Sequence, residues 1–129
     1  MNKGHFTQWA ARFAVASELC KREYQVALTL GNHPSVDLMV VSPRGQSFSI
    51  DVKGVSSRSG WLVHSHAPRD DLFYVFVIVP RDKPNRYFVM TQQEVNDAIA
   101  DRASRGSYPS GFLFPVVKPH ENRWGILPP

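Results

Sequence analysis

Apolar and polar residues alternate from Ser35 to Lys53 in a pattern that predicts a β-hairpin. Both arms are rich in β-branched and large apolar residues, and the Pro43-Arg44-Gly45 segment between them is typical of a turn. If these three residues form the loop, with the glycine in the left-handed region, Ser42 faces Gln46. One face of the hairpin is then apolar throughout, which fixes the register because a shift by one residue would expose it. That face consists of Val36, Leu38, Val40, Phe48, Ile50 and Val52.

A helix is expected before the hairpin. From about Thr7 to Glu23, apolar residues recur at helical spacing on one stripe. This stripe contains Trp9, Phe13, Ala16, Leu19 and Cys20. Tyr24 to Leu30 is expected to form a short strand, and Gly31 to Pro34 a turn.

The second half of the chain predicts more strands and another helix. Gly54 to Asp71 is expected to be a loop with a short strand near Trp61, and the unbroken apolar run from Leu72 to Val79 is typical of a strand covered on both faces. Arg86 to Met90 predicts a further strand, and a capping box at Thr91 and Glu94 begins a second helix. A proline-rich tail supplies apolar docking residues, namely Phe112, Phe114, Trp124, Ile126 and Leu127. The order of elements predicts an α/β fold with a mixed central β-sheet of about four strands flanked by helices.

Composition limits the class of protein. Residues 1–129 suffice for a single domain with a real core, and a hydrophobic content of 43% argues against disorder. The net charge of +4 favours a polyanionic partner such as nucleic acid without requiring one. One cysteine, Cys20, excludes an internal disulfide and is expected to be buried in the first helix. No apolar run approaches the length of a membrane span, so we expect a cytoplasmic protein.

Two aspartates fall on the polar face of the hairpin. The register places Asp37 directly opposite Asp51, where like charges destabilise the pair unless a cation lies between them. Lys53, two residues beyond Asp51, lies on the same face. The arrangement predicts a metal site at Asp37 and Asp51. The alternative is a surface ion pair between Asp51 and Lys53 or Arg44, which would contribute little to stability.

These residues resemble the motif of the PD-(D/E)XK nuclease superfamily, closest to its small Holliday-junction-resolvase-like branch. The likeness covers about residues 7–80: a helix, Asp37, a gap of 13 residues, Asp51-Val52-Lys53 and then a buried strand. It implies a restriction-endonuclease-like core with Asp37, Asp51 and Lys53 as catalytic residues. It also implies that both acids bind Mg²⁺, with Mn²⁺ as a substitute, for phosphodiester hydrolysis. The implied partner is DNA, with RNA as a second candidate, and relatives of this kind are commonly homodimers.

The first helix departs from that pattern. In the resolvase-like branch an acid lies seven positions before a helical leucine, and counting back from Leu19 gives Arg12 instead. Arg12 is expected to face the sheet, where it either binds phosphate or neutralises Asp37 and impairs the enzyme. A catalytically impaired nuclease-fold domain that binds nucleic acid or a protein partner is therefore the alternative function. Glu18, on the opposite face of the helix, is expected to be a solvated charge near Arg22.

Basic and aromatic side chains outside the hairpin face are candidates for nucleic-acid contacts. They are Arg44 in the hairpin loop and Arg58, Trp61 and Arg69 in the long loop. A plain flexible loop explains the same residues equally well. His64 and His66 form a His-x-His pair without an obvious third zinc ligand. His33 lies near the start of the Asp37 strand.

Overall fold

The computed structural model describes residues 2–29, 36–106 and 112–129. Its centre is a five-stranded sheet in the order β1-β2-β3-β5-β6. Neighbouring strands are antiparallel except β3 and β5, which run parallel. The strands span Gln25–Leu28 (β1), Leu38–Val41 (β2), Ser47–Val55 (β3), Leu72–Ile78 (β5) and Arg86–Thr91 (β6). The expected mixed α/β fold is confirmed, with a fifth strand in the sheet.

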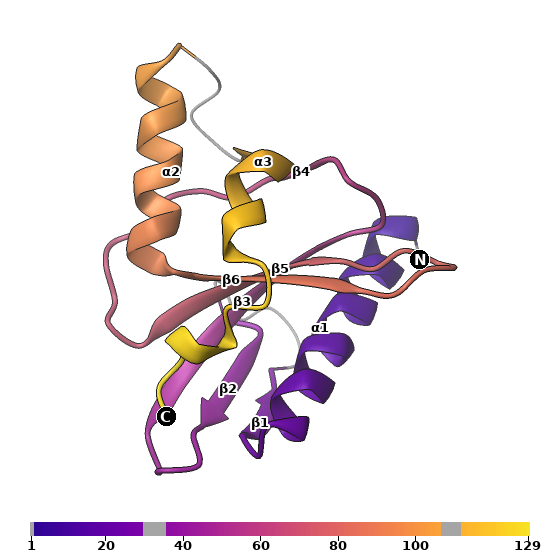
Figure 1. Ribbon diagram of the computed structural model, residues 1–129, viewed down its shortest axis with the longest axis vertical. Helices are drawn as coiled ribbons and strands as arrows, with labels where there is room; N and C mark the ends of the chain where they lie inside the picture. Colours follow the sequence, from indigo (N-terminus) through magenta and orange to yellow (C-terminus); the bar gives the residue numbers. More distant parts are fainter. Residues whose placement is uncertain (1, 30–35, 107–111) are drawn as a thin grey trace.

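Helices cover both faces of this sheet (Figure 1). On one face α1 (Lys3–Lys21) packs against a core that contains residues of β2, β3, β5 and β6. The other face carries α2 (Gln92–Ser104), α3 (Phe114–Val117) and a small sheet of β4 (Gly60–Trp61) and β7 (Phe112–Leu113). Two 3₁₀ turns, η1 (Lys118–His120) and η2 (Trp124–Ile126), follow α3. The sheet thus separates two apolar cores.

The β2–β3 hairpin has the expected register. The Ser42 amide donates to the Gln46 carbonyl at 2.8 Å, and Gly45 adopts a φ of +88°. Leu38 pairs with Ile50, and Val40 pairs with Phe48. All six residues of the predicted apolar face are buried. The alternation of the sequence therefore identified correctly which face of the hairpin turns inward.

The first helix begins earlier than expected and buries a different stripe. Its buried residues are Ala11, Val15 and Leu19. Phe13 is 57% exposed and Cys20 is exposed, so the expected stripe was wrong at these two positions, whereas Leu19 is buried as expected. A small side chain faces the sheet at position 11 because the helix lies very close to β3 there: a Cβ at Gly54 would be 2.5 Å from the Cβ of Ala11. This close approach leaves no room for a larger residue at Ala11 or at Gly54.

The other elements follow their sequence patterns closely. β5 is buried over almost its whole length, as an apolar run without alternation predicts. Thr91 and Glu94 form the predicted capping box at the start of α2. Phe114, Trp124 and Leu127 of the tail are buried. The expected turn at 31–34, including His33, lies outside the described residues. Within the described residues, no helix has both the length and the apolar character needed to cross a membrane.

Candidate functional site

Asp37 lies immediately before β2, one position beyond the last paired residues of the hairpin. Because Leu38 pairs with Ile50, the next position places Asp37 opposite Asp51, as the sequence predicted. A carboxylate oxygen of Asp37 accepts a hydrogen bond from the Val52 amide at 2.7 Å. Thr29, at the end of β1, donates its hydroxyl to the Asp37 carbonyl at 3.1 Å. The aspartate is therefore held by both of its neighbouring strands.

Asp51 and Lys53 occupy the same face of β3. The Lys53 Nζ lies 3.4 Å from an Asp51 carboxylate oxygen, and the side chains are 33% and 5% exposed respectively. The pair is thus not the exposed surface ion pair that was the alternative interpretation. A carboxylate this deeply buried is costly unless a positive charge compensates it. The site places two carboxylates together where water is largely excluded.

Burial raises the pKa of Asp51 to about 7, with the positive charge of Lys53 opposing the shift and the negative charge of Asp37 adding to it. Tyr74 pairs with Asp51 across the parallel β3–β5 register. Burial and the Asp51 charge raise the pKa of Tyr74 to about 12. The Tyr74 hydroxyl is buried and has no hydrogen-bond partner among the described residues. Tyr74 was not recognised from the sequence because it lies within a uniformly apolar run.

Arg12 reaches the site from α1. One of its terminal nitrogens lies 2.9 Å from an Asp37 carboxylate oxygen, with the arginine side chain 22% exposed. The guanidinium carbon also lies 4.8 Å from the centroid of the Trp9 ring. Its Nε is buried without a partner among the described residues. The expectation that Arg12 faces the sheet and meets Asp37 is confirmed, and Glu18 pairs with Lys21 and Arg22 away from the site.

Gln8, one helical turn before Arg12, also bonds to the β3 backbone. Its amide nitrogen donates to the Val52 carbonyl at 2.6 Å, and its amide oxygen accepts from the Gly54 amide at 3.1 Å. These two bonds fix the strand on either side of Lys53. Gln8 was missed by the sequence analysis, although its position four residues before Arg12 places both on one helix face.

The site offers only a small number of protein oxygen ligands for a hard divalent ion such as Mg²⁺. Asp37 and Asp51 provide two carboxylates, and Mg²⁺ commonly takes one or two carboxylates and keeps several waters. Among the described residues no group of three or more His, Cys, Asp or Glu side chains could hold a metal ion. One Asp37 oxygen accepts the Val52 amide and the other forms the ion pair with Arg12, but a carboxylate oxygen has a second lone pair for a further partner. The Tyr74 hydroxyl, which has no hydrogen-bond partner among the described residues, is a further oxygen atom beside Asp51.

The other predicted nucleic-acid contacts are dispersed. Arg44 lies in the hairpin loop, at the end of β3 opposite to Lys53, and Arg69 pairs with Asp71 at 3.1 Å. Arg58 is exposed, with its guanidinium carbon 4.3 Å from the centroid of the Phe114 ring. Trp61 is only 4% exposed and packs edge-on against Phe76, so its predicted contact with nucleic acid was wrong. The exposed His64 and His66 belong to no metal-binding group among the described residues.

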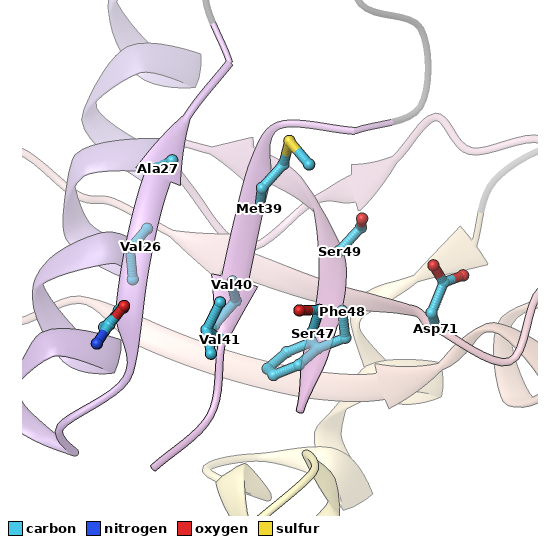
Figure 2. Close-up of a pocket in the computed structure, with 10 residues that line it drawn as sticks. Val26, Ala27, Met39, Val40, Val41, Ser47, Phe48, Ser49 and Asp71 are labelled. Atoms are coloured by element: carbon cyan, nitrogen blue, oxygen red, sulfur yellow. The ribbon is translucent and has the colours of Figure 1, made fainter. Parts of the chain in front are cut away.

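Several hollows lined by described residues lie around the sheet. One of about 270 Å³ is lined by Gln8, Arg12 and neighbouring residues of α1, next to the aspartates. A second, of about 420 Å³, lies over β1, β2 and the first half of β3, and Figure 2 shows Met39, Ser47 and Ser49 lining it. A third, of about 430 Å³, lies beyond the other end of β3. The Asp37–Asp51–Lys53 site therefore lies between the hollow over the first half of β3 and the end of that strand.

The fold is similar to that of a solved bacterial homing endonuclease, I-Ssp6803I. The two share 16% sequence identity, with a TM-score of 0.67 over 98% of this chain and 91% of that one. No protein-family model and no curated protein matches the sequence. At this identity the likeness shows a common fold.

Proposed function

We propose that this chain is a metal-dependent endonuclease of the PD-(D/E)XK type that hydrolyses phosphodiester bonds in DNA. One observation carries the proposal: Asp37 and Asp51 are opposed across the hairpin, with Lys53 3.4 Å from Asp51. The fold shared with a homing endonuclease supports a DNA substrate. A buried acid pair beside a lysine has little value for packing, and this favours a chemical role.

Each side chain has a distinct task in this proposal. Asp37 and Asp51 would hold Mg²⁺ or Mn²⁺, which stabilises charge on the phosphate and makes a nucleophilic water available near neutral pH. Lys53 places a compact positive charge beside Asp51, where it orients water toward the phosphorus. Arg12 has further N–H groups for a phosphate oxygen while it bonds Asp37. Gln8 keeps the backbone around Lys53 in place.

A nicking assay tests the proposal. Supercoiled, linear and branched DNA are incubated with the protein in Mg²⁺, Mn²⁺ or chelator, and the products are resolved on gels. We expect cleavage with either metal and none in chelator. Absence of cleavage on every substrate, together with absence of metal binding by calorimetry, would refute it.

The second candidate is a nuclease-fold domain that binds nucleic acid or a protein partner without cleaving DNA. The contact between Arg12 and Asp37 favours it, because a fixed positive charge there lowers the affinity for a cation. Salt-sensitive DNA binding without cleavage would identify this case. Arg12→Glu then decides whether the arginine is the cause: it is expected to strengthen Mg²⁺ binding and raise cleavage. Unchanged metal affinity in Arg12→Glu would show that Arg12 is not what limits the site.

A further inference from the structure

The hollow beyond the second end of β3, here called the basic groove, is rich in positive charge. It lies between the residues that follow β3 and the turn that joins β5 to β6, and its volume is about 430 Å³. Four cationic side chains line it, Arg58, Arg81, Lys83 and Arg86, against a single acid, Asp82. Apolar carbon from Ile78, Pro80 and Pro84 also lines it. A cationic rim around an apolar surface is the environment that a sugar-phosphate backbone requires.

The four cations differ in how far their charges are already neutralised. Arg86 makes two hydrogen bonds of 2.8 Å to the carboxylate of Glu121, so its charge is paired. Arg58 rests on the Phe114 ring. Arg81 and Lys83 are exposed and make no ion pair or hydrogen bond within the part of the chain that the structure describes. Two unpaired charges therefore remain at the β5–β6 turn.

The basic groove continues the face of β3 that carries the site. Asp51, Lys53 and Val55 alternate onto one face of the strand, and Val55 pairs with Ile78, which lines the groove. Lys53 lies three residues before Ser56, which is the first residue that lines the groove. Three residues of extended strand span about 10 Å. With a rise of about 3.4 Å per nucleotide, that separation corresponds to about three nucleotides of a DNA strand.

We infer that the basic groove binds the phosphate backbone of DNA about three nucleotides from the phosphate held at Lys53. The inference rests on the proposed nuclease function for its placement relative to cleavage. Binding of DNA in the groove does not depend on that function, because the groove needs only a polyanionic ligand. Arg81 and Lys83 bind phosphates directly, and Arg58 is a third, partly immobilised cation.

The test measures DNA affinity in chelator, where no metal-dependent cleavage occurs. A fluorescently labelled duplex of about 25 base pairs is titrated with the wild type and with the double variant Arg81→Ala, Lys83→Ala at several salt concentrations. Removal of two phosphate contacts should make the slope of log K against log[salt] less steep by about 1.8. At ~0.1 M salt the same slope gives a loss of affinity of about 60-fold.

A matched control removes the same charge at two positions outside the groove. Lys21→Ala with Arg105→Ala changes the exposed C-terminal ends of α1 and α2, and should leave both affinity and salt slope unchanged. All four positions are exposed, so circular dichroism should show an intact fold in both variants. An unlabelled poly-glutamate competitor, which carries carboxylates in place of phosphates, should not displace the duplex.

An unchanged affinity and salt slope in the Arg81, Lys83 variant would overturn the inference, whatever the nicking assay gives. Equal weakening in the control pair would overturn it also, since the effect would then follow net charge alone. Displacement by poly-glutamate at matched charge would assign the groove to an acidic protein instead. If the wild type never cleaves but the groove variant loses affinity, the groove stands as a DNA-binding surface and the nuclease proposal fails.

Discussion

The two halves of one face of β3 have opposite characters. In the first half, Ser47 and Ser49 line an open, mostly apolar hollow beside Met39, which is 58% exposed. In the second half, Asp51 and Lys53 form an ion pair and the face leads to the basic groove. Both halves alternate the same way and belong to the same sheet.

The electrostatic character of each half therefore depends on the elements packed around the strand as well as on the strand itself. Around the second half, Arg12 of α1 forms an ion pair with Asp37, and Gln8 of α1 hydrogen-bonds to the β3 backbone. Tyr74 of β5 lies beside Asp51. Burial there raises the pKa of Asp51. Ser49 is similarly enclosed but carries no charge, so its burial creates no comparable electrostatic cost. On this face of β3 the raised pKa of Asp51 therefore arises where charge and burial coincide.

The largest contrast is expected between Asp51→Asn and Ser49→Ala. Asp51→Asn removes a proposed metal ligand and should reduce cleavage by about 1,000-fold or more, because the ion contributes several kcal/mol to transition-state stabilisation. Its fold should remain intact or gain slight stability, since a buried charge is removed. Cleavage assays, calorimetry with Mg²⁺ and thermal melts measure these effects. Equal activity in Asp51→Asn and in Ser49→Ala would remove Asp51 from the site.

Lys53→Ala is expected to have the next largest effect. It should reduce turnover by about 100-fold while metal affinity changes little, because the lysine acts on the water and phosphate rather than on the ion. Lys21→Ala, at the exposed end of α1, should leave turnover unchanged. Single-turnover rates at saturating Mg²⁺ provide the measurement. A fall in metal affinity that accounts for the whole loss in Lys53→Ala would contradict this division of roles.

The metal-free protein should lose stability as pH rises from about 4 to 7. In the unfolded chain Asp51 titrates at its ordinary pKa of 3.8, but in the folded protein burial raises that pKa to about 7. Between these values only the folded state holds the proton, so the free energy of unfolding falls with increasing pH and then levels off. The total is at most about 4 kcal/mol at 1.36 kcal/mol per pKa unit.

The difference between wild type and Asp51→Asn isolates this effect, because both proteins share every other titrating group. Urea denaturation in chelator from pH 4.5 to 8 should give curves that diverge as pH rises, with the variant relatively more stable at pH 8. Parallel curves would show that Asp51 titrates near its ordinary pKa in the folded protein.

Two glycines at opposite ends of β3 provide the smallest expected contrast. A Cβ at Gly54 would lie 2.5 Å from the Cβ of Ala11, so Gly54→Ala should displace α1 at a cost of about 2 kcal/mol. Gly45 has open space around it but a φ of +88°, so Gly45→Ala should cost about 1 kcal/mol through backbone strain. Cleavage should decline further in Gly54→Ala, since Gln8 and Arg12 move with the helix. Denaturation and cleavage assays of the two variants test this, and equal cleavage would show that helix position does not matter.

The hairpin and its register were determined by the sequence alone. Alternating apolar residues and one turn glycine predicted the register that brings Asp37, Asp51 and Lys53 together, because the pairing of a hairpin is set within one continuous segment of chain. The same holds for the capping box at Thr91 and for the buried run of β5. Local patterns of this kind do not depend on how distant elements pack.

Only the tertiary structure decided what surrounds these residues. The side chain that α1 can bury at position 11 depends on how closely Ala11 approaches Gly54. The burial of Trp61 depends on its ring contacts with Phe76 of β5 and Phe88 of β6. The two bonds of Gln8 to β3 and the position of Tyr74 beside Asp51 likewise join residues far apart in the chain. Periodicity specifies which side of an element is apolar, but a burial cost or a pKa depends on which atoms from other elements exclude water there. For this reason the sequence located the acids, and the packing of α1 and β5 against β3 determined their environment.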